Sequence, residues 1–193
     1  MFRNPGAICQ AGALSPIPVY TYATWDSGKK GANIALTGSD LIATCSVGAG
    51  VVLSTTGKSS GKWYWEITVN VSTNRGFIGV GKSTIPLDSQ LGADADGFSY
   101  VDNANKRTNN SDAAYGATWA AGDIIGVYLD MDAGTLGFEK NDVDQGQAFT
   151  GLSGTFYAGW SNNLVGQVTA NFGASALAYT PPSGYASGLY TVS

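Results

Sequence analysis

The chain has 193 residues, the length of one domain, and carries a formal net charge of −4 with only 12% charged residues. This acidic balance leaves no basic stripe that could replace counterions on a nucleic-acid backbone, so we expect no nucleic-acid partner. Histidine does not occur, which removes the commonest general base and metal ligand; we expect no metal site, no cofactor and no catalysis. No apolar run approaches the roughly 20 residues of a membrane span, so we expect no membrane insertion.

The first 20 residues show no hydrophobic period and are interrupted by Pro5, Pro16 and Pro18. Because proline cannot continue a helix, we predict an extended N-terminal arm over residues 1–20 that is free to pair with a neighbouring subunit. Cys9 lies in this arm and Cys45 lies beyond it. Their spacing fits neither a zinc site nor a redox pair, and it leaves open whether they form a disulfide or remain two thiols.

The clearest strand signal covers residues 62–71, with the sequence KWYWEITVNV. Apolar side chains occupy its odd positions, whereas the even positions carry Lys62, Glu66, Thr68 and Asn70. A period of two predicts a strand with one face in a core and the other toward water or a partner. The residues predicted to share one core are Trp63, Trp65, Ile67, Ile125, Val127 and Leu129.

Short apolar runs follow at residues 76–81, 97–101, 124–131, 135–140, 156–160 and 168–172, with turn residues between them. No segment has the period of an amphipathic helix, and the glycine and aromatic content favours short strands joined by tight turns. The pattern predicts an all-β protein, an antiparallel β-sandwich formed as a single domain by residues 21–193.

Residues 76–83, GFIGVGKS, fit the P-loop pattern of nucleotide-binding proteins letter for letter. A working P-loop needs a helix directly after the loop, so that the helix N-terminus points at the phosphates. The residues that follow include Pro86 and several glycine and aspartate breaks, with no apolar stripe. We therefore interpret Phe77, Ile78 and Val80 as a strand between turns and expect no nucleotide contact from Lys82.

Two polar stretches, residues 82–96 and 102–114, are rich in Asn, Asp and Ser and hold few apolar residues. Long loops on a rigid β scaffold often carry binding residues, although they can also simply connect strands. Amide groups beside an aromatic face suit sugars, but a tyrosine in such a loop is equally well explained as a core residue with its hydroxyl at the rim. The candidate contact residues are Tyr100, Asn103, Asn105, Lys106, Arg107, Asn109, Asn110 and Tyr115.

Four segments in order resemble the SPRY domain family: residues 60–66 (SGKWYWE), 78–81 (IGVG), 122–130 (GDIIGVYLD) and 134–141 (GTLGFEKN). The flanks resemble the phage-associated branch of that family at residues 23–25, 30–34, 149–152, 168–173 and 179–185. The resemblance runs from about residue 21 to residue 184. It implies a concanavalin-like jelly roll of the SPRY type, similar in outline to legume lectins, that binds partners through loops at one end without catalysis.

The resemblance leads to the hypothesis of a non-enzymatic bacteriophage virion surface protein, assembled in the host cytoplasm, that serves host-receptor attachment as a tail-fibre or tail-tip component. The arm would contact other virion proteins, and the loops would contact a host surface glycan or protein; a homo-oligomer is compatible with both.

Two alternatives stay open. The first is a capsid decoration or cement protein that clamps neighbouring coat subunits on the phage head. The second is a glycoside hydrolase, which needs two carboxylates roughly 5–9.5 Å apart across a groove. In the sequence Glu66 stands alone on its strand, and Asp130 and Asp132 flank a turn where aspartate normally caps backbone.

Overall fold

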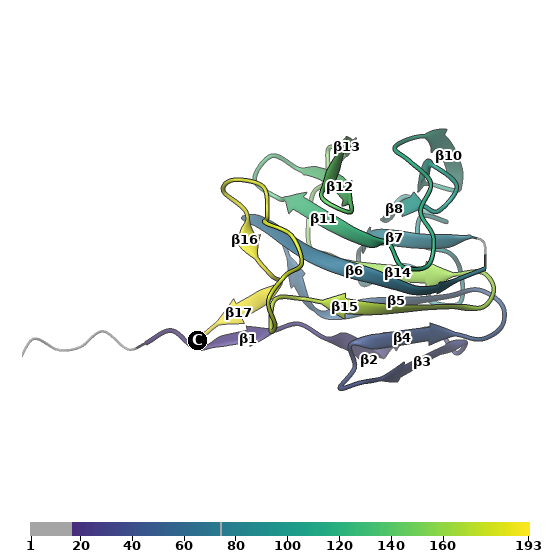
Figure 1. The fold of residues 1–193 in the computed structure, drawn as a ribbon, viewed down its shortest axis with the longest axis horizontal. Helices are drawn as coiled ribbons and strands as arrows, with labels where there is room; N and C mark the ends of the chain where they lie inside the picture. Colours follow the sequence, from purple (N-terminus) through teal and green to yellow (C-terminus); the bar gives the residue numbers. More distant parts are fainter. Residues whose placement is uncertain (1–16, 74) are drawn as a thin grey trace, which may run out of the picture.

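The computed structural model describes residues 17–73 and 75–193, which form two antiparallel sheets and a short ribbon at one end (Figure 1). The first sheet, called sheet I, has seven strands in the order β10-β9-β8-β7-β14-β5-β2. Its strands are β2 (Trp25–Lys30), β5 (Gly50–Lys58), β7 (Gly76–Gly81), β8 (Gly97–Val101), β9 (Asn105–Thr108), β10 (Ser111–Ala114) and β14 (Phe156–Asn162).

The second sheet, called sheet II, follows the order β13-β12-β11-β6-β15-β4-β3, and β16 pairs with β6 beside this path. Its strands are β3 (Ile34–Thr37), β4 (Ile42–Cys45), β6 (Lys62–Ser72), β11 (Ile124–Asp130), β12 (Thr135–Lys140), β13 (Val143–Thr150), β15 (Gly166–Asn171) and β16 (Ala186–Ser187). The ribbon consists of β1 (Tyr20–Tyr22) and β17 (Tyr190–Val192). Every described element is a strand, so the predicted antiparallel β-sandwich is confirmed.

The main core lies between the two sheets and is built largely by β6 and its neighbours. Trp65 is 1% exposed and lies opposite Val127 of β11, as the alternating pattern predicts. Of the residues predicted to share this core, Trp65, Ile67, Ile125, Val127 and Leu129 are buried in it. Trp63 is only partly buried, because its ring lies at the end of the sheet in edge contact with Tyr190 of the ribbon, with centroids 5.3 Å apart.

The other face of β6 is not open to water at its beginning. Tyr64 and Glu66 are both buried there, although their positions in the alternating pattern predict exposure or a partner. The segment from Gly173 to Ser187 covers them, since β16 runs parallel to β6 and pairs Ser187 with Tyr64. The chain itself therefore provides the partner for this half of the strand face.

Residues 82–96 form no strand, as predicted, but they do contribute to packing. Ile85 and Leu91 are buried in a second apolar cluster on the outer face of sheet I, together with Val51, Leu53, Phe77 and Val101. The Ser161 hydroxyl accepts a hydrogen bond of 2.8 Å from the Leu91 amide and holds this segment against β14. Two of the few apolar residues in this stretch are therefore core residues, which its polar composition did not indicate.

The segment that matches the P-loop pattern is the central strand β7 and its exit. A Cβ atom added to Gly79 would collide with the Phe98 carbonyl oxygen of β8, so this glycine allows two strands to approach closely. Lys82 follows in a turn and forms an ion pair with Asp96 at 2.8 Å. The described chain continues from there without a helix, and the glycine spacing is explained by packing.

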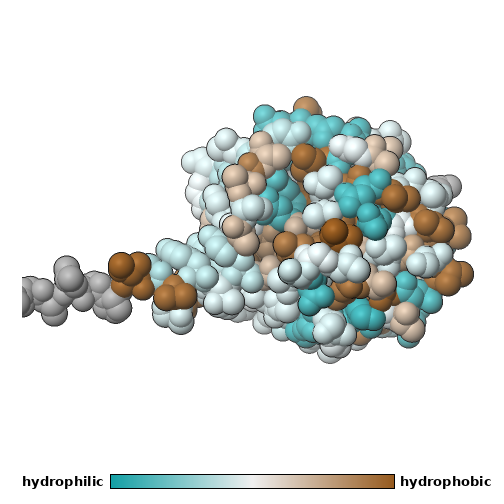
Figure 2. All heavy atoms as spheres, turned by 60° about the horizontal axis from the view of Figure 1, so that its bottom comes forward, coloured by the Kyte–Doolittle hydropathy of each residue, from teal (hydrophilic) through white to brown (hydrophobic). Residues whose placement is uncertain are grey.

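The ribbon projects from the end of the sandwich opposite to β10 (Figure 1). Hydrogen bonds between Val19 and Ser193 in both directions extend the pairing of β1 with β17 by one residue. Apolar atoms lie at the outer end of this ribbon, away from the sandwich (Figure 2). The predicted arm up to residue 16, including Cys9, lies outside the described residues; Cys45 is buried in the main core.

Candidate functional site

The polar stretch at residues 102–114 is not an irregular loop but folds largely as the hairpin β9–β10 at the edge of sheet I. Its turn residues Asn109 and Asn110 have φ angles of 49° and 56°, the left-handed pair that a tight hairpin turn requires. Asn105 is in β9, where it pairs with Val101 and Ala114. Asn103 is exposed in the turn that joins β8 to β9.

The two tyrosines among the predicted contact residues support the sandwich from inside. Tyr100 is fully buried, and its hydroxyl donates to the Ala117 carbonyl. Tyr115 packs edge-on against Tyr100, with centroids 5.2 Å apart, and donates to the Gly146 carbonyl. Burial raises the pKa of Tyr100 to about 12, so its hydroxyl stays protonated. Both hydroxyls are used to hold loops to the core.

The two cations of the hairpin have different roles. Arg107 is buried and forms an ion pair with Asp112 across the hairpin at 2.7 Å, and it also donates to Asn110 in the turn. Lys106 points the other way, toward sheet II. Its ammonium group donates to the Ala148 carbonyl at 2.6 Å and lies 5.3 Å from the ring centroid of Phe149. Arg107 therefore stabilises the hairpin, whereas Lys106 bridges the two sheets.

A groove of about 380 Å³ opens where the hairpin β9–β10 faces β13 of the other sheet. Its volume is within the range of roughly 300–1,000 Å³ that is usual for ligand sites. The lining residues are Phe98, Lys106, Thr108, Ser111, Ala113, Ala148, Phe149 and Thr150. We call this cavity the edge groove.

Strand β10 forms one wall of the edge groove and is the outermost strand of sheet I. All of its residues are exposed, and its outer side pairs with no described strand. An extended peptide can add to such an edge through main-chain hydrogen bonds while alternate side chains enter an adjacent pocket. The edge groove thus combines a free strand edge, two aromatic side chains and one ammonium group.

Only Lys106 among the predicted contact residues lines the edge groove. Asn109 and Asn110 lie at the tip of the hairpin, next to the groove rather than in it. The aromatic residues Phe98 and Phe149 were missed because they belong to different sheets and lie far apart in sequence. A signal for the hairpin was present, however, since two Asn residues between short segments are typical of a two-residue turn.

A pair of carboxylates that the sequence separates is brought together on the outer face of sheet II. Glu66 of β6 and Glu139 of β12 both lie opposite Gly126 of β11. The Tyr64 hydroxyl is 3.1 Å from a Glu139 oxygen and 3.5 Å from a Glu66 oxygen. Glu66 therefore does not stand alone, as the sequence pattern had suggested, because the intervening glycine leaves room for Tyr64 between the two acids.

The two acids differ in what holds them. Glu66 accepts hydrogen bonds of 2.8 Å from the backbone amides of Ala178 and Tyr179. Burial raises the pKa of Glu139, and the hydrogen bond from Tyr64, which lowers that pKa, does not reverse the effect. The Tyr64 hydroxyl has a single proton to donate, so both contacts are satisfied when Glu139 carries a proton of its own. The arrangement fastens a loop to the sheet and leaves both acids buried.

Within residues 17–73 and 75–193, no group of three acidic or cysteine side chains is placed to hold a metal ion. The same residues contain no helix long and apolar enough to cross a membrane.

Residues 62–174 match the SPRY domain family, a span that begins with β6 and includes every strand through β15. The match covers more than half of the chain. The chain belongs to the SPRY domain family. Strands β1 to β5 and the segment from residue 175 onward lie outside the matched span.

Two similar proteins place this SPRY chain among known sequences and structures. The ATP-dependent RNA helicase DDX1 of Xenopus laevis is 31% identical over 135 residues, which are 68% of this chain and 18% of the helicase. The chain thus spans less than one fifth of the length of DDX1. The SPRY domain of human HERC1 superposes with a TM-score of 0.67 at 22% identity, over 76% of this chain and 96% of that domain. This likeness shows the fold.

Proposed function

We propose that this SPRY chain is a non-enzymatic surface protein of a bacteriophage virion and that it serves host-receptor attachment as a tail-fibre or tail-tip component. The observation that carries the proposal is the separation of two unlike surfaces on one rigid sandwich. The β1–β17 ribbon, which continues the N-terminal arm, lies at the opposite side from the hairpin that borders the edge groove (Figure 1). Such a layout suits a module that is held at one end and binds at the other.

The ribbon supports the proposed contact with other virion proteins. Ile17 is 88% exposed and Val19 is 61% exposed, and Val192 of the opposite strand is 57% exposed. Exposed apolar side chains that gather at one end of a molecule favour burial against another protein. A second copy of the chain or another virion protein would bury this surface, and the phage-like flanking sequence favours a virion as the setting.

The edge groove supports the proposed contact with a host surface protein. Its strand edge supplies unpaired main-chain donors and acceptors, and Lys106 supplies a positive charge on a chain that is acidic overall. An extended, partly acidic peptide on the cell surface would complement both features.

Capsid decoration is the second candidate function, and the exposed apolar ribbon favours it as well. A decoration protein would use the ribbon and arm to clamp coat subunits, and the edge groove would then have no receptor to bind. The two functions differ in location on the particle, head against tail, and in whether the free protein competes with the phage for host cells.

Glycoside hydrolysis is not supported by the carboxylate pair. The catalytic acids of such enzymes face a substrate groove. Here Glu66 is 3% exposed, and its oxygens are occupied by the backbone amides of Ala178 and Tyr179. We therefore propose no enzymatic activity.

The proposal is tested by phage particles that carry variants of this chain. Deletion of residues 2–16 is expected to leave a folded, soluble protein that no longer joins the particle, as measured by immunoblotting of purified virions. Ala113→Arg, which places a bulky charge in the edge groove, is expected to join the particle normally but to reduce host adsorption. Ala35→Arg, on the exposed edge strand β3, is the matched control. Normal incorporation of the deletion variant, or loss of incorporation with Ala113→Arg, would reverse the assignment of the two surfaces.

A further inference from the structure

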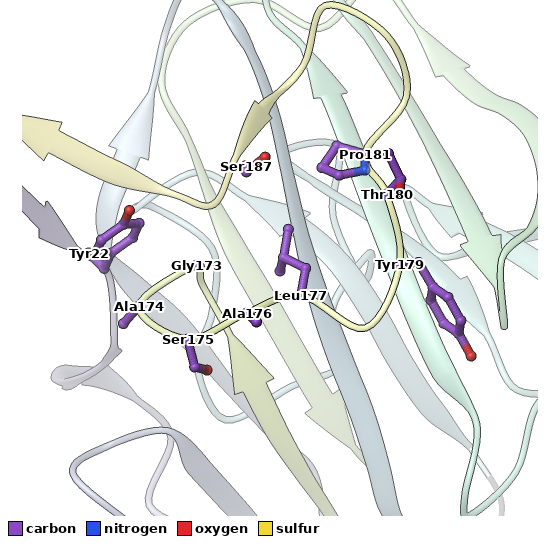
Figure 3. A pocket seen from close by; sticks show the side chains of 10 residues that line it. All are labelled: Tyr22, Gly173, Ala174, Ser175, Ala176, Leu177, Tyr179, Thr180, Pro181 and Ser187. Atoms are coloured by element: carbon purple, nitrogen blue, oxygen red, sulfur yellow. The ribbon is translucent and has the colours of Figure 1, made fainter.

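A second hollow, of about 480 Å³, lies beside β16 at the ribbon end of the molecule. It is walled by the loop that follows β15 and by Tyr22 of β1 and Ser187 of β16. Figure 3 shows Tyr22 at one end of the hollow, Tyr179 at the other with its ring pointing away, and Leu177 and Ser187 between them. We call this cavity the loop hollow.

The wall of the loop hollow is held rigidly by side chains from sheet II. The Asn171 amide donates to the Ala176 carbonyl at 2.9 Å, and its oxygen accepts from the Gly173 amide at 3.0 Å. The carboxylate of Glu66 accepts from the amides of Ala178 and Tyr179. Gly173 also approaches Gly188 so closely that a Cβ atom on Gly173 would lie 2.7 Å from the Gly188 Cα. A wall held in this way needs no ordering when a ligand binds.

The side-chain polar groups around the loop hollow are uncharged, and among them the Ser175 hydroxyl donates to the Asn171 side-chain oxygen at 3.3 Å. Its lining contains no Lys, Arg, Asp or Glu side chain, so it offers nothing to pair with a phosphate or a carboxylate. The lining includes Tyr22, Thr180 and Ser187, and no hydrogen bond among the described residues engages their hydroxyl groups. Each hydroxyl can both donate and accept a hydrogen bond.

Apolar surface alternates with these hydroxyls. The side chains of Leu177 and Pro181 and the ring of Tyr22 line the same cavity. A sugar ring presents hydroxyls around its edge and flat patches of C–H groups on its faces, which is the complement of such a lining. The volume suits one or two sugar residues rather than a long chain, because ligand sites of several hundred Å³ hold small molecules.

We propose that the loop hollow is a binding site for a neutral saccharide of one or two residues. The site is distinct from the edge groove and shares no lining residue with it. This proposal does not depend on whether the edge groove binds a protein. It also does not depend on whether the chain belongs to the tail or to the head of the particle.

The test is an NMR titration of the full-length, ¹⁵N-labelled protein with a panel of neutral oligosaccharides: maltose, cellobiose, mannobiose and lactose. The expected result is saturable movement of the amide signals of residues 174–177 and 187 with at least one of these sugars, and none with glucuronic acid. Thr180→Val and Ser187→Ala each remove one hydroxyl and are expected to weaken binding by about threefold to tenfold, the usual effect of one hydrogen bond. Thr118→Val, at an exposed threonine outside the hollow, is expected to bind as the original chain does.

Three results would overturn the proposal. The first is no saturable movement with any sugar of the panel, and the second is movement confined to residues of the edge groove. The third is binding by both Thr180→Val and Ser187→Ala that is as strong as binding by the original chain. The signals of the variants report directly whether they are folded, so loss of binding through unfolding is recognised at once. The NMR titration is independent of the phage experiments on the edge groove. A negative outcome of those phage experiments would not change what the titration shows about the loop hollow.

Discussion

The hairpin at residues 105–114 and the loop at residues 173–181 are both surface segments, but their hydrogen bonds go to different places. In the hairpin the side chains bond to one another, as Arg107 does to Asp112 and Asn110. In the loop it is mainly the backbone that is bonded, by Asn171 and Glu66 of sheet II, and the Thr180 hydroxyl has no hydrogen-bond partner among the described residues, whereas that of Ser175 donates to Asn171. The polarity of a segment therefore does not show whether its side chains are available for a ligand. Their availability depends on whether other groups already satisfy the hydrogen bonds of the segment.

Both segments depend on the same core, and the largest effect is expected from breaking it. Trp65→Ala should lower the free energy of unfolding by about 3–5 kcal/mol, because the fully buried indole leaves a cavity behind. Urea denaturation followed by tryptophan fluorescence measures this change. Val71→Ala, at a residue 39% exposed on the same strand, is the control with an expected loss below about 1 kcal/mol. Equal losses in the two variants would contradict the placement of the core.

The next largest effect is expected from a variant that weakens the anchoring of the loop but leaves the hairpin intact. Glu66→Gln replaces one of the oxygens that accept the Ala178 and Tyr179 amides with an amide group, so one buried donor loses its partner. The free energy of unfolding should fall by about 1–3 kcal/mol. Hydrogen exchange should accelerate at residues 178 and 179, while the amides of the hairpin keep their protection. Acceleration in the hairpin as well would show that the two segments are not independent.

The pH dependence of stability sharpens the account of the carboxylate pair that anchors this loop. Burial raises the pKa of Glu139 above its ordinary value of 4.5, so the folded chain keeps a proton that the unfolded chain has already released. The free energy of unfolding contributed by this group therefore declines as the pH rises from 4.5 through the folded pKa. The decline amounts to about 1.4 kcal/mol for each unit by which the pKa is raised.

Glu139→Gln removes this titration and should become more stable relative to the original chain as the pH rises. Urea denaturation of both proteins at a series of pH values isolates the effect, because the other carboxylates near this site, Glu66, Asp142 and Asp144, are present in both. A stability difference that does not change with pH would contradict the raised pKa of Glu139.

A smaller effect is expected from the side-chain bonds within the hairpin. Arg107→Ala removes the ion pair with the partly exposed Asp112 and should lower the free energy of unfolding by about 1 kcal/mol. Amide exchange of residues 105–114 should accelerate, and that of residues 173–181 should not. Lys106→Ala, at a lysine whose ammonium group donates to the Ala148 carbonyl and lies near the Phe149 ring, is the matched cation control. If amide exchange accelerates in both segments in Arg107→Ala, the two segments are not held independently of each other.

The smallest effect is expected at Lys82 in the P-loop-like segment. Its ion pair with Asp96 is partly exposed, so Lys82→Ala should change the free energy of unfolding by less than about 0.5 kcal/mol. Calorimetric titration with ATP and GTP in the presence of magnesium should show no binding to either protein. Saturable nucleotide binding that is lost in Lys82→Ala would restore the P-loop interpretation.

Much of the sandwich could be predicted from local patterns. The predicted segments at residues 76–81, 97–101 and 135–140 coincide with β7, β8 and β12, because each is a short apolar run between turn residues. The β9–β10 hairpin was predicted as a loop, because polar side chains on an edge strand give no alternation of apolar residues. The cover over Tyr64 and Glu66 could not be foreseen, since Glu66 and Ala178 lie 112 residues apart in sequence.

The candidate sites were less predictable than the fold for the same reason. Lys106 was identified from the polarity of its segment, but Phe98 and Phe149 meet it only through the packing of two sheets. The loop hollow is lined largely by alanine, serine and glycine, residue types that form no recognisable motif. Free hydrogen-bonding capacity depends on which neighbours the fold supplies, and a single sequence does not give that.

The central claim is that the chain is held in the particle at its ribbon end and binds the host through the edge groove. Competition for host cells tests this claim most directly. Host cells are incubated with the purified full-length chain before phage is added, and the adsorption rate is measured. The original protein and Ala35→Arg are expected to slow adsorption in a concentration-dependent manner, whereas Ala113→Arg is expected to have little effect. Unchanged adsorption at saturating concentrations of the original protein, or equal competition by Ala113→Arg, would contradict receptor attachment through the edge groove.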